Sequence, residues 1–223
     1  MCGRYNLEYT AAIDKLLSQH GFQGEFKPAY NIAPTDFAPI IIQDRHRPSE
    51  IIPARWWLTP SWSSGLSQKF SMFNARAENL LTSRAFKGPF QHKRCIVPAS
   101  GFIEWHRKEK EKQPYLVELD GKGLAMAGIW DYWQDGENVL FSFAIITKPA
   151  SPSFQTLHSR MPVLLKEEDI STWLDPHTTA KQALPLIDTS ISHGWQMTPI
   201  DNSIGHSKNK TKPQLSDIQS IVN

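Results

Sequence analysis

The apolar residues of this chain fall in short runs, and the length of these runs constrains the fold more than any other feature. Residues 39–43, 94–98 and 139–147 have the length and the β-branched or aromatic content of strands. The 16 prolines interrupt the sequence often, which favours a loop-rich fold. Further strands are predicted at residues 50–58, 115–119, 124–130 and 195–199.

Helical patterns are fewer than strand patterns. Thr10 can cap a helix over residues 10–20. Asn74 stands at the start of a second pattern, residues 75–86, which is rich in Ala, Leu and Glu. Shorter helices are predicted at residues 166–174 and 178–187. We therefore predict an α+β fold: a single domain, residues 1–223, with a central barrel-like, mostly antiparallel β-sheet flanked by short helices.

The composition narrows the class of protein. With 40% hydrophobic and 21% charged residues, the chain resembles soluble globular proteins. No apolar run is long enough to cross a bilayer, and the first residues lack the apolar core of a secretory signal, so we expect a cytoplasmic protein. A net charge of +2 argues against a protein that coats long duplex DNA, but it allows one that grips a few phosphates in one groove. Residues 201–223 are polar and are expected to form a partly flexible tail.

Cys2 is the candidate with the most reactive chemistry. Methionine is normally trimmed before a small residue, and loss of Met1 leaves an α-amine and a thiol on Cys2. An α-amine is partly neutral, and therefore nucleophilic, at neutral pH. The thiol can attack an acyl carbon with the amine as base, or the amine can condense with an aldehyde while the thiol closes a thiazolidine ring. Position two alone could be an accident of a frayed end, but Gly3 permits close approach and Arg4 suits an anion.

Cys95 is expected to be inert. It stands in a predicted strand, Arg94-Cys95-Ile96-Val97-Pro98, so we read it as a buried core residue. In the cytoplasm, Cys95 and Cys2 are expected to remain thiols. No histidines stand at ligand spacing to them, so the sequence predicts no metal site and no cofactor.

Three further segments offer polar groups for a site. Asn74 and Arg76 fit a helix N-terminus that binds an anion, although a plain helix cap with a solvated arginine explains them equally well. Glu104 lies between apolar and aromatic neighbours and can act as acid or base, whereas strand alternation alone would turn it outward to water. His158 and Arg160 flank Ser159 and suit an anion site, although a lone histidine is more often structural.

Tryptophans are frequent and can serve as core or as stacking platforms. Core packing is the expectation for Trp56 and Trp57. Trp62 stands on a loop of Ser and Gly residues, which makes it the better candidate for stacking on a nucleobase.

Taken together, an ordered set of motifs resembles the SOS-response-associated peptidase (SRAP) family. Each motif is weak alone, but the set spans nearly the whole chain. The matching segments are Met1-Cys2-Gly3-Arg4, Tyr30-Asn31-Ile32-Ala33-Pro34, Asn74-Ala75-Arg76-Ala77-Glu78, Ser83-Arg84-Ala85-Phe86, Arg94-Cys95-Ile96-Val97-Pro98-Ala99, Gly101-Phe102-Ile103-Glu104-Trp105, Ala127-Gly128-Ile129-Trp130 and His158-Ser159-Arg160-Met161-Pro162.

The resemblance implies a DNA-damage function: capture of abasic sites in single-stranded DNA as a stable covalent adduct. It implies a monomer without metal that meets replication-fork proteins and joins the nucleoid when engaged with DNA. The family name reflects proteolytic removal of a short leader before the cysteine; here only Met1 precedes Cys2, which an aminopeptidase can remove. Carried over by position, the catalytic residues would be Cys2, Asn74, Glu104 and His158, and the DNA or phosphate ligands would be Arg4, Arg76, Arg160 and Trp62.

The chain also departs from the family pattern. The family usually has Trp-Gly where this chain has Trp56-Trp57, Thr where it has Asn79, and often Asp where it has Ser159. Two other functions stay open. Class II glutamine amidotransferases also begin Met-Cys-Gly, so the chain could be an N-terminal nucleophile amidohydrolase; it could also be a non-covalent reader of modified DNA.

Overall fold

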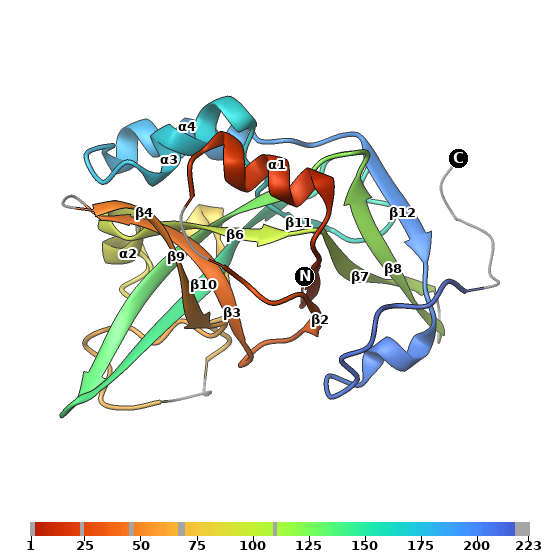
Figure 1. Ribbon diagram of the computed structural model, residues 1–223, viewed down its shortest axis with the longest axis horizontal. Coiled ribbons are helices and arrows are strands. Elements are labelled where there is room, and N and C mark those ends of the chain that lie inside the picture. The colour runs from red at the N-terminus through yellow and green to blue at the C-terminus, as the bar shows by residue number, and fades with distance from the viewer. Residues whose placement is uncertain (1–2, 23–24, 45–46, 67–69, 109–110, 217–223) are drawn as a thin grey trace.

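The fold combines two β-sheets with a few short helices (Figure 1). The structure is a computed structural model. It describes residues 3–22, 25–44, 47–66, 70–108 and 111–216. Met1 and Cys2 therefore lie outside the described residues, as do residues 217–223 of the expected tail.

The first sheet has five strands in the described part of the chain, and each neighbouring pair is antiparallel. In spatial order they are β12 (Trp195–Pro199), β8 (Glu111–Leu119), β7 (Gly101–Lys108), β1 (Arg4–Leu7) and β2 (Ala29–Ile32). The first described strand of the chain, β1, thus lies inside the sheet, between β7 and β2.

The second sheet closes into a barrel. Its ring consists of β10 (Asn138–Pro149), β4 (Arg47–Arg55), β3 (Phe37–Asp44), β6 (Arg94–Ala99) and β9 (Leu124–Asp135). Because β9 also pairs with β10, the ring has no free edge there. The long strand β10 additionally pairs with β5 (Asn74–Arg76) and β11 (Arg160–Pro162). Most pairings are antiparallel, so the predicted barrel-like α+β architecture is confirmed.

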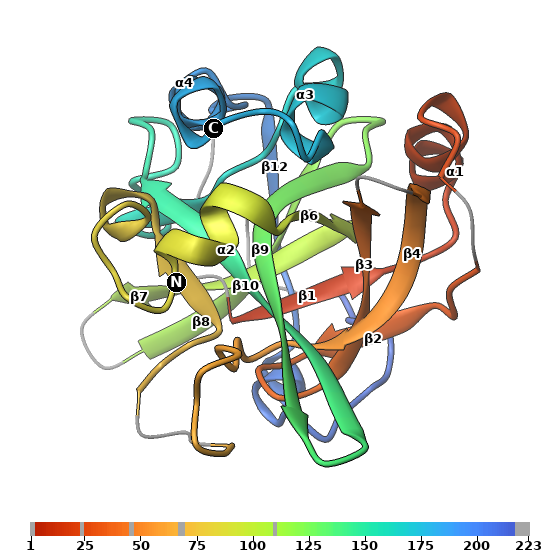
Figure 2. The ribbon, with the colours of Figure 1, turned by 90° about the vertical axis from the view of Figure 1, so that its left-hand side faces the viewer.

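Short helices cover one side of this framework. In Figure 2, α1, α3 and α4 lie together along the top of the molecule. The α-helices are α1 (Ala11–Gln19), α2 (Lys87–His92), α3 (Ile170–Leu174) and α4 (Ala180–Asp188), and the 3-10 helices are η1 (Ala77–Asn79), η2 (Glu167–Asp169) and η3 (Asn202–Gly205). As predicted, Thr10 caps α1, accepting a hydrogen bond from the amide of Ile13 at 3.1 Å. Among the described residues, no helix has the length and apolar character needed to cross a membrane.

The strands predicted from apolar runs are all present, as β3, β4, β6, β8, β9, β10 and β12. One helix prediction was wrong. Residues 74–76 form strand β5, and the 75–86 segment continues as the 3-10 helix η1 and turns. Because β5 pairs in parallel with β10, its backbone is committed to a sheet and no helix can start at Asn74. Local helix propensity was therefore overridden by tertiary pairing.

Aromatic packing joins the two sheets. Tyr5 of β1 meets the edge of Trp56 with 5.1 Å between ring centroids, and Trp56 stacks on Phe143 of β10 at 6.3 Å. All three side chains have no exposed surface. Trp56 is thus a core residue, as predicted, and its indole Nε1 donates to the carbonyl of Phe73 at 2.8 Å.

Gly128 of β9 lies where the packed barrel leaves no room for a side chain. A Cβ added there would lie 2.8 Å from Cys95 Sγ and 3.1 Å from Val97 Cγ2, which is too close. We expect Gly128→Ala to lower the free energy of unfolding by about 1–3 kcal/mol through overpacking. Urea denaturation would measure this effect. Gly88→Ala is the matched control, since nothing lies within 4 Å of its added Cβ in α2. Equal stability of Gly128→Ala and wild type would contradict the expectation.

Candidate active site

The described chain starts beside a buried carboxylate. In the antiparallel register of β1 and β7, Arg4 faces Ile103, so Glu104 lies one step further, next to Gly3. Glu104 is only 4% exposed, and its Oε1 accepts a hydrogen bond from the amide of Trp105 at 3.1 Å. The expectation from strand alternation, that Glu104 would turn outward to water, is wrong.

Glu104 alternates with Ile103 along β7 and therefore lies on the same covered face as Phe102, which accounts for its burial. On one face Phe102 packs against Phe154 and Trp195, with ring centroids 5.8 Å and 6.3 Å away. On the other, Ile103 packs in a small cluster with Ile204 from the C-terminal segment. The carboxylate of Glu104 is therefore shielded from bulk water, a setting in which an acid or base can be effective.

Arg4 and Trp105 form a cationic and aromatic patch beside this carboxylate. The guanidinium carbon of Arg4 lies 5.9 Å from the centre of the Trp105 ring, and Lys112 Nζ lies 5.0 Å from it. Burial lowers the pKa of Arg4, and the charge of Asp36 opposes that effect. Sequence reasoning placed Trp105 in a motif but assigned it no role; its position directly after Glu104 was the available signal.

Asn74 and Arg76 lie on β5 and not on a helix. Asn74 is 7% exposed and stands opposite Ile145, whereas Arg76 is exposed and stands opposite Thr147. The anion site expected at a helix N-terminus is therefore not formed by these residues. A buried amide and an exposed cation are instead presented two residues apart along one short strand.

His158 and Arg160 lie where the chain enters β11. The amide and the carbonyl of Arg160 both lie close to His158 Nδ1, at 3.0 and 3.1 Å, so the backbone of Arg160 orients the imidazole ring. The Arg160 guanidinium binds both carboxylate oxygens of Glu78, at 2.7 and 3.0 Å, and Nη2 also donates to the carbonyl of Thr147 at 2.6 Å. The hydrogen bond from Arg160, chief among several causes, lowers the pKa of Glu78. Sequence reasoning did not find Glu78 as the partner of Arg160.

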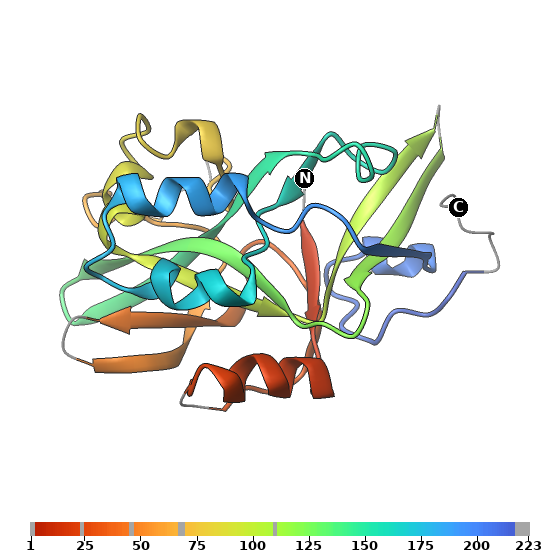
Figure 3. The same ribbon diagram turned by 90° about the horizontal axis from the view of Figure 1, so that it is seen from above.

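Packing contacts bring these segments toward the start of β1. The amide of His158 donates to the carbonyl of Phe154 at 3.2 Å, and Phe154 packs on Phe102 of β7. Strands β5 and β11 both pair with β10 at Thr147. Figure 3 shows the start of β1 between β11 and the β7–β8 hairpin. Glu104 and the segment before His158 thus reach β1 through β7, and β5 with Asn74 is joined to β11 through β10.

Trp62 is exposed on a loop that is firmly attached to the barrel. Its side chain is 53% exposed, and the Arg84 guanidinium carbon lies 4.1 Å from its ring centre. The amide of Ser61 donates to Asp131 Oδ2 at 2.8 Å, and Trp133 Nε1 donates to the carbonyl of Ser63 at 2.8 Å. The predicted stacking residue is therefore held in place, with a cation on one face that sequence reasoning had not assigned.

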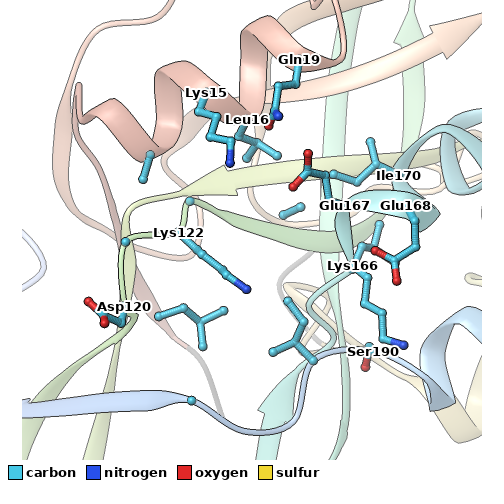
Figure 4. A pocket seen from close by; sticks show the side chains of 18 of the residues that line it. Lys15, Leu16, Gln19, Asp120, Lys122, Lys166, Glu167, Glu168, Ile170 and Ser190 are labelled. Atoms are coloured by element: carbon cyan, nitrogen blue, oxygen red, sulfur yellow. The ribbon is translucent and has the colours of Figure 1, made fainter.

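Cys95 is a buried core thiol, and the cavity described below is lined by other residues than the predicted site. Cys95 has no exposed surface, and burial raises the pKa of its thiol well above the ordinary value, which confirms it as core. Within the described residues, no group of three or more His, Cys, Asp or Glu could hold a metal ion. A cavity of about 700 Å³ lies between α1, the β8–β9 turn and residues 189–194, and none of the described residues lining it is a predicted site residue (Figure 4). Lys15, Lys122 and Glu167 are among its lining residues, so side chains of both charges face it.

The chain is similar to known proteins along nearly its whole length. Residues 1–207 match the family described as SOS response associated peptidase (SRAP). Abasic site processing protein YoqW of Bacillus subtilis is 34% identical over 213 residues, which covers 91% of this chain and 95% of that protein. Abasic site processing protein HMCES of Gallus gallus is 29% identical and aligns with 88% of this chain and 68% of its own length.

Solved structures share the fold. A crystal structure of a protein from Bacteroides thetaiotaomicron superposes with a TM-score of 0.75 at 26% identity, covering 89% of this chain and 92% of that one. A protein from Bordetella bronchiseptica superposes with a TM-score of 0.76 at 19% identity, covering 90% and 100%. Because residues 1–207 match the family and relatives above 30% identity align with most of the chain, the chain belongs to the SOS response associated peptidase (SRAP) family.

Proposed function

We propose that this protein captures abasic sites in single-stranded DNA as a covalent adduct, through Cys2 once Met1 has been removed. Relatives that align with most of the chain are named abasic site processing proteins. The observation that carries the proposal is the buried carboxylate of Glu104, which the β1–β7 register sets beside the start of the described chain. A shielded carboxylate at that point can exchange protons with a reactive N-terminal residue.

The chemistry follows from the 1,2-aminothiol. An abasic site in its open form presents an aldehyde. The α-amine of Cys2 adds to the aldehyde carbon, and the carbinolamine loses its hydroxyl group as water to leave a Schiff base. The thiol then adds across this C=N bond, sulfur to carbon and proton to nitrogen, which closes a five-membered thiazolidine ring. One water molecule leaves in the whole sequence, and no oxidant or reductant is needed.

Three side chains are assigned to proton transfer and positioning. Glu104 protonates the departing hydroxyl group of the carbinolamine. His158, whose Nδ1 is engaged by the backbone of Arg160, exchanges protons through Nε2. Asn74, which is nearly buried on β5, holds the amine or the opened sugar by hydrogen bonds.

The DNA strand is bound by cations and aromatic rings. Arg4 beside Trp105 and the exposed Arg76 bind phosphates, and Trp62 stacks on a base. Arg160 was expected to bind a phosphate as well. Because Glu78 already engages two of its nitrogens, a phosphate there would have to share or displace that carboxylate.

Intact mass spectrometry after mixing with a single-stranded oligonucleotide that carries one abasic site would test the proposal. We expect a species with the summed mass of protein lacking Met1 and DNA, less one water, and a band that survives heating in detergent. Cys2→Ala keeps the amine but lacks the thiol, so it should give no stable band and should be trapped only by borohydride reduction of the Schiff base. An intact-base oligonucleotide is the control DNA.

Other outcomes would favour the other functions. Ammonia release from glutamine that is lost in Cys2→Ala would indicate an amidohydrolase. Binding to modified duplex DNA that is unchanged in Cys2→Ala, without any adduct, would indicate a non-covalent reader. Wild-type protein without Met1 that forms no adduct on abasic single strands would refute the proposal.

A further inference from the structure

Residues 201–214, here called the C-terminal loop, are closed at their base beside the five-stranded sheet. Ile200 and Leu215 form an antiparallel bridge, and the amide of Ser216 donates to the carbonyl of Pro199 at 3.1 Å. The amide of Ile200 also donates to the carbonyl of Pro114 in β8 at 3.0 Å. The loop therefore starts from the β12 edge of the sheet, and Figure 1 shows it at the lower right of the molecule.

The other end of the loop is held by Asn31, on the opposite edge of the sheet. Asn31 Nδ2 lies within hydrogen-bond distance of three loop carbonyls, those of Ile204 at 3.1 Å, His206 at 3.0 Å and Asn209 at 2.8 Å. The backbone amide of Asn31 donates to Asn6 Oδ1 of β1 at 2.9 Å. Asn31 has no exposed surface and adopts a left-handed backbone with φ +49°. One buried residue thus connects the loop to β1.

Two lysines of the loop reinforce this connection. Lys210 Nζ donates to the carbonyl of Asn31 at 2.9 Å and to the carboxylate of Asp36. Lys212 Nζ lies 2.7 Å from Glu8 Oε2, just after β1 ends. The family match ends at residue 207, so both lysines lie beyond the matched range, whereas their partners Asp36 and Glu8 lie within it.

The loop also touches the strand that carries Glu104. Ile204 packs with Ile103 and Trp105, the residues on either side of Glu104. Asn31 Nδ2 donates to the carbonyl of Ile204 in the loop, and the amide of Asn31 donates to Asn6, two residues after Arg4. The same loop therefore contacts β7 directly and is connected to β1 through Asn31 of β2.

We propose that Asn31 is a positioning residue, which with the C-terminal loop fixes the start of β1 relative to Glu104. The inference rests on the capture reaction proposed above. That reaction needs an amine, an aldehyde and a proton donor in contact, and a displacement of about 1 Å can cost about 100-fold in rate. Asn31 does not touch the DNA; it acts through β1 and the loop.

Asn31→Gly tests this assignment with little added backbone strain. Glycine tolerates the left-handed backbone, so the variant removes the amide group while keeping the conformation accessible. Adduct formation would be followed in single turnover at increasing DNA concentration, well below the melting temperature of every variant. We expect the maximal rate constant to fall by about 10- to 100-fold. The DNA concentration that gives half the maximal rate should change little, since no phosphate ligand is altered.

Two lysine variants complete the test. Lys210→Met removes the contact with Asn31 and Asp36 and should also lower the maximal rate constant, by a smaller factor. Lys208→Met is the matched control, because Lys208 is exposed in the same loop and forms no ion pair among the described residues. It should react at the wild-type rate.

The outcomes separate the two proposals. If wild type forms no adduct, the proposed function fails. If wild type reacts and folded Asn31→Gly matches its maximal rate despite a lower melting temperature, the proposed function stands and Asn31 is merely structural. Should circular dichroism show that Asn31→Gly is unfolded, the decision passes to Lys210→Met: a wild-type rate would overturn the inference, and a loss absent from Lys208→Met would support it.

Discussion

Replacing Arg94 by methionine is expected to lower the free energy of unfolding by about 3–5 kcal/mol. Arg94 is 4% exposed, and its guanidinium donates only to backbone carbonyls among the described residues. These are the carbonyls of Trp173, Phe90, Gln91, Asp175 and Thr178, at 2.7 to 3.2 Å. Each buried acceptor that loses its partner costs about 1–3 kcal/mol, and these costs are not additive.

Arg94 joins its own strand β6 to two other segments, and this explains the size of the effect. The guanidinium binds the C-terminal end of α2, the C-terminal end of α3 and the turn that follows α3. Burial lowers the pKa of Arg94, and the charge of Asp175 opposes that effect. Guanidinium chloride denaturation monitored by tryptophan fluorescence would measure the loss.

Arg94→Lys is the informative control. Lysine keeps the charge but lacks the planar fork, so it can satisfy only some of the five carbonyls. Its stability should fall between those of wild type and Arg94→Met. A loss below about 1 kcal/mol in Arg94→Met would mean that water or neighbouring groups replace the guanidinium.

The sequence predicted the barrel better than the five-stranded sheet. Strands β3, β6 and β10 contain apolar runs whose burial does not depend on register, so local pattern was sufficient. Strand β1 has four residues, Arg-Tyr-Asn-Leu, which alternate between polar and apolar types but are too few to predict a strand by themselves. It is a strand because β7 and β2 pair with it on either side. No local rule contains that information.

In the candidate site too, sequence motifs single out residues, whereas long-range contacts decide their surroundings. The ordered motifs single out Glu104, Asn74 and His158, whose catalytic roles stay predictions. Their environments could not be predicted from the motifs. Glu104 lies on the face of β7 that Phe154 and Trp195 cover at Phe102, and both aromatic residues come from much later in the chain. Asn74 lies on a strand because β10 pairs with it. The residues that sequence reasoning did not assign, Trp105 and Glu78, are partners across such long-range contacts.

Glu104→Gln is expected to lower the maximal rate constant of adduct formation by about 10²- to 10⁴-fold, the usual contribution of a general acid or base. Glutamine has nearly the same shape, and its Oε1 can still accept the hydrogen bond from the amide of Trp105, so the fold should be retained. It cannot transfer a proton at neutral pH, so loss of the carboxyl group would slow the dehydration of the carbinolamine. Single-turnover kinetics on abasic single-stranded DNA would measure the change.

Glu118→Gln is the matched control for this prediction. Glu118 lies on the neighbouring strand β8, and burial together with the charge of Glu8 raises the pKa of its carboxyl group. The substitution removes the same atoms and the same charge from the same sheet, but away from the start of β1. Glu118→Gln should therefore form adduct at the wild-type rate. If the two variants slowed equally, the effect would come from the charge of the sheet. If Glu104→Gln reacted like wild type, Glu104 would be a structural residue. His158 would then be the remaining candidate for the proton transfers, because the backbone of Arg160 engages Nδ1 of its ring and not Nε2.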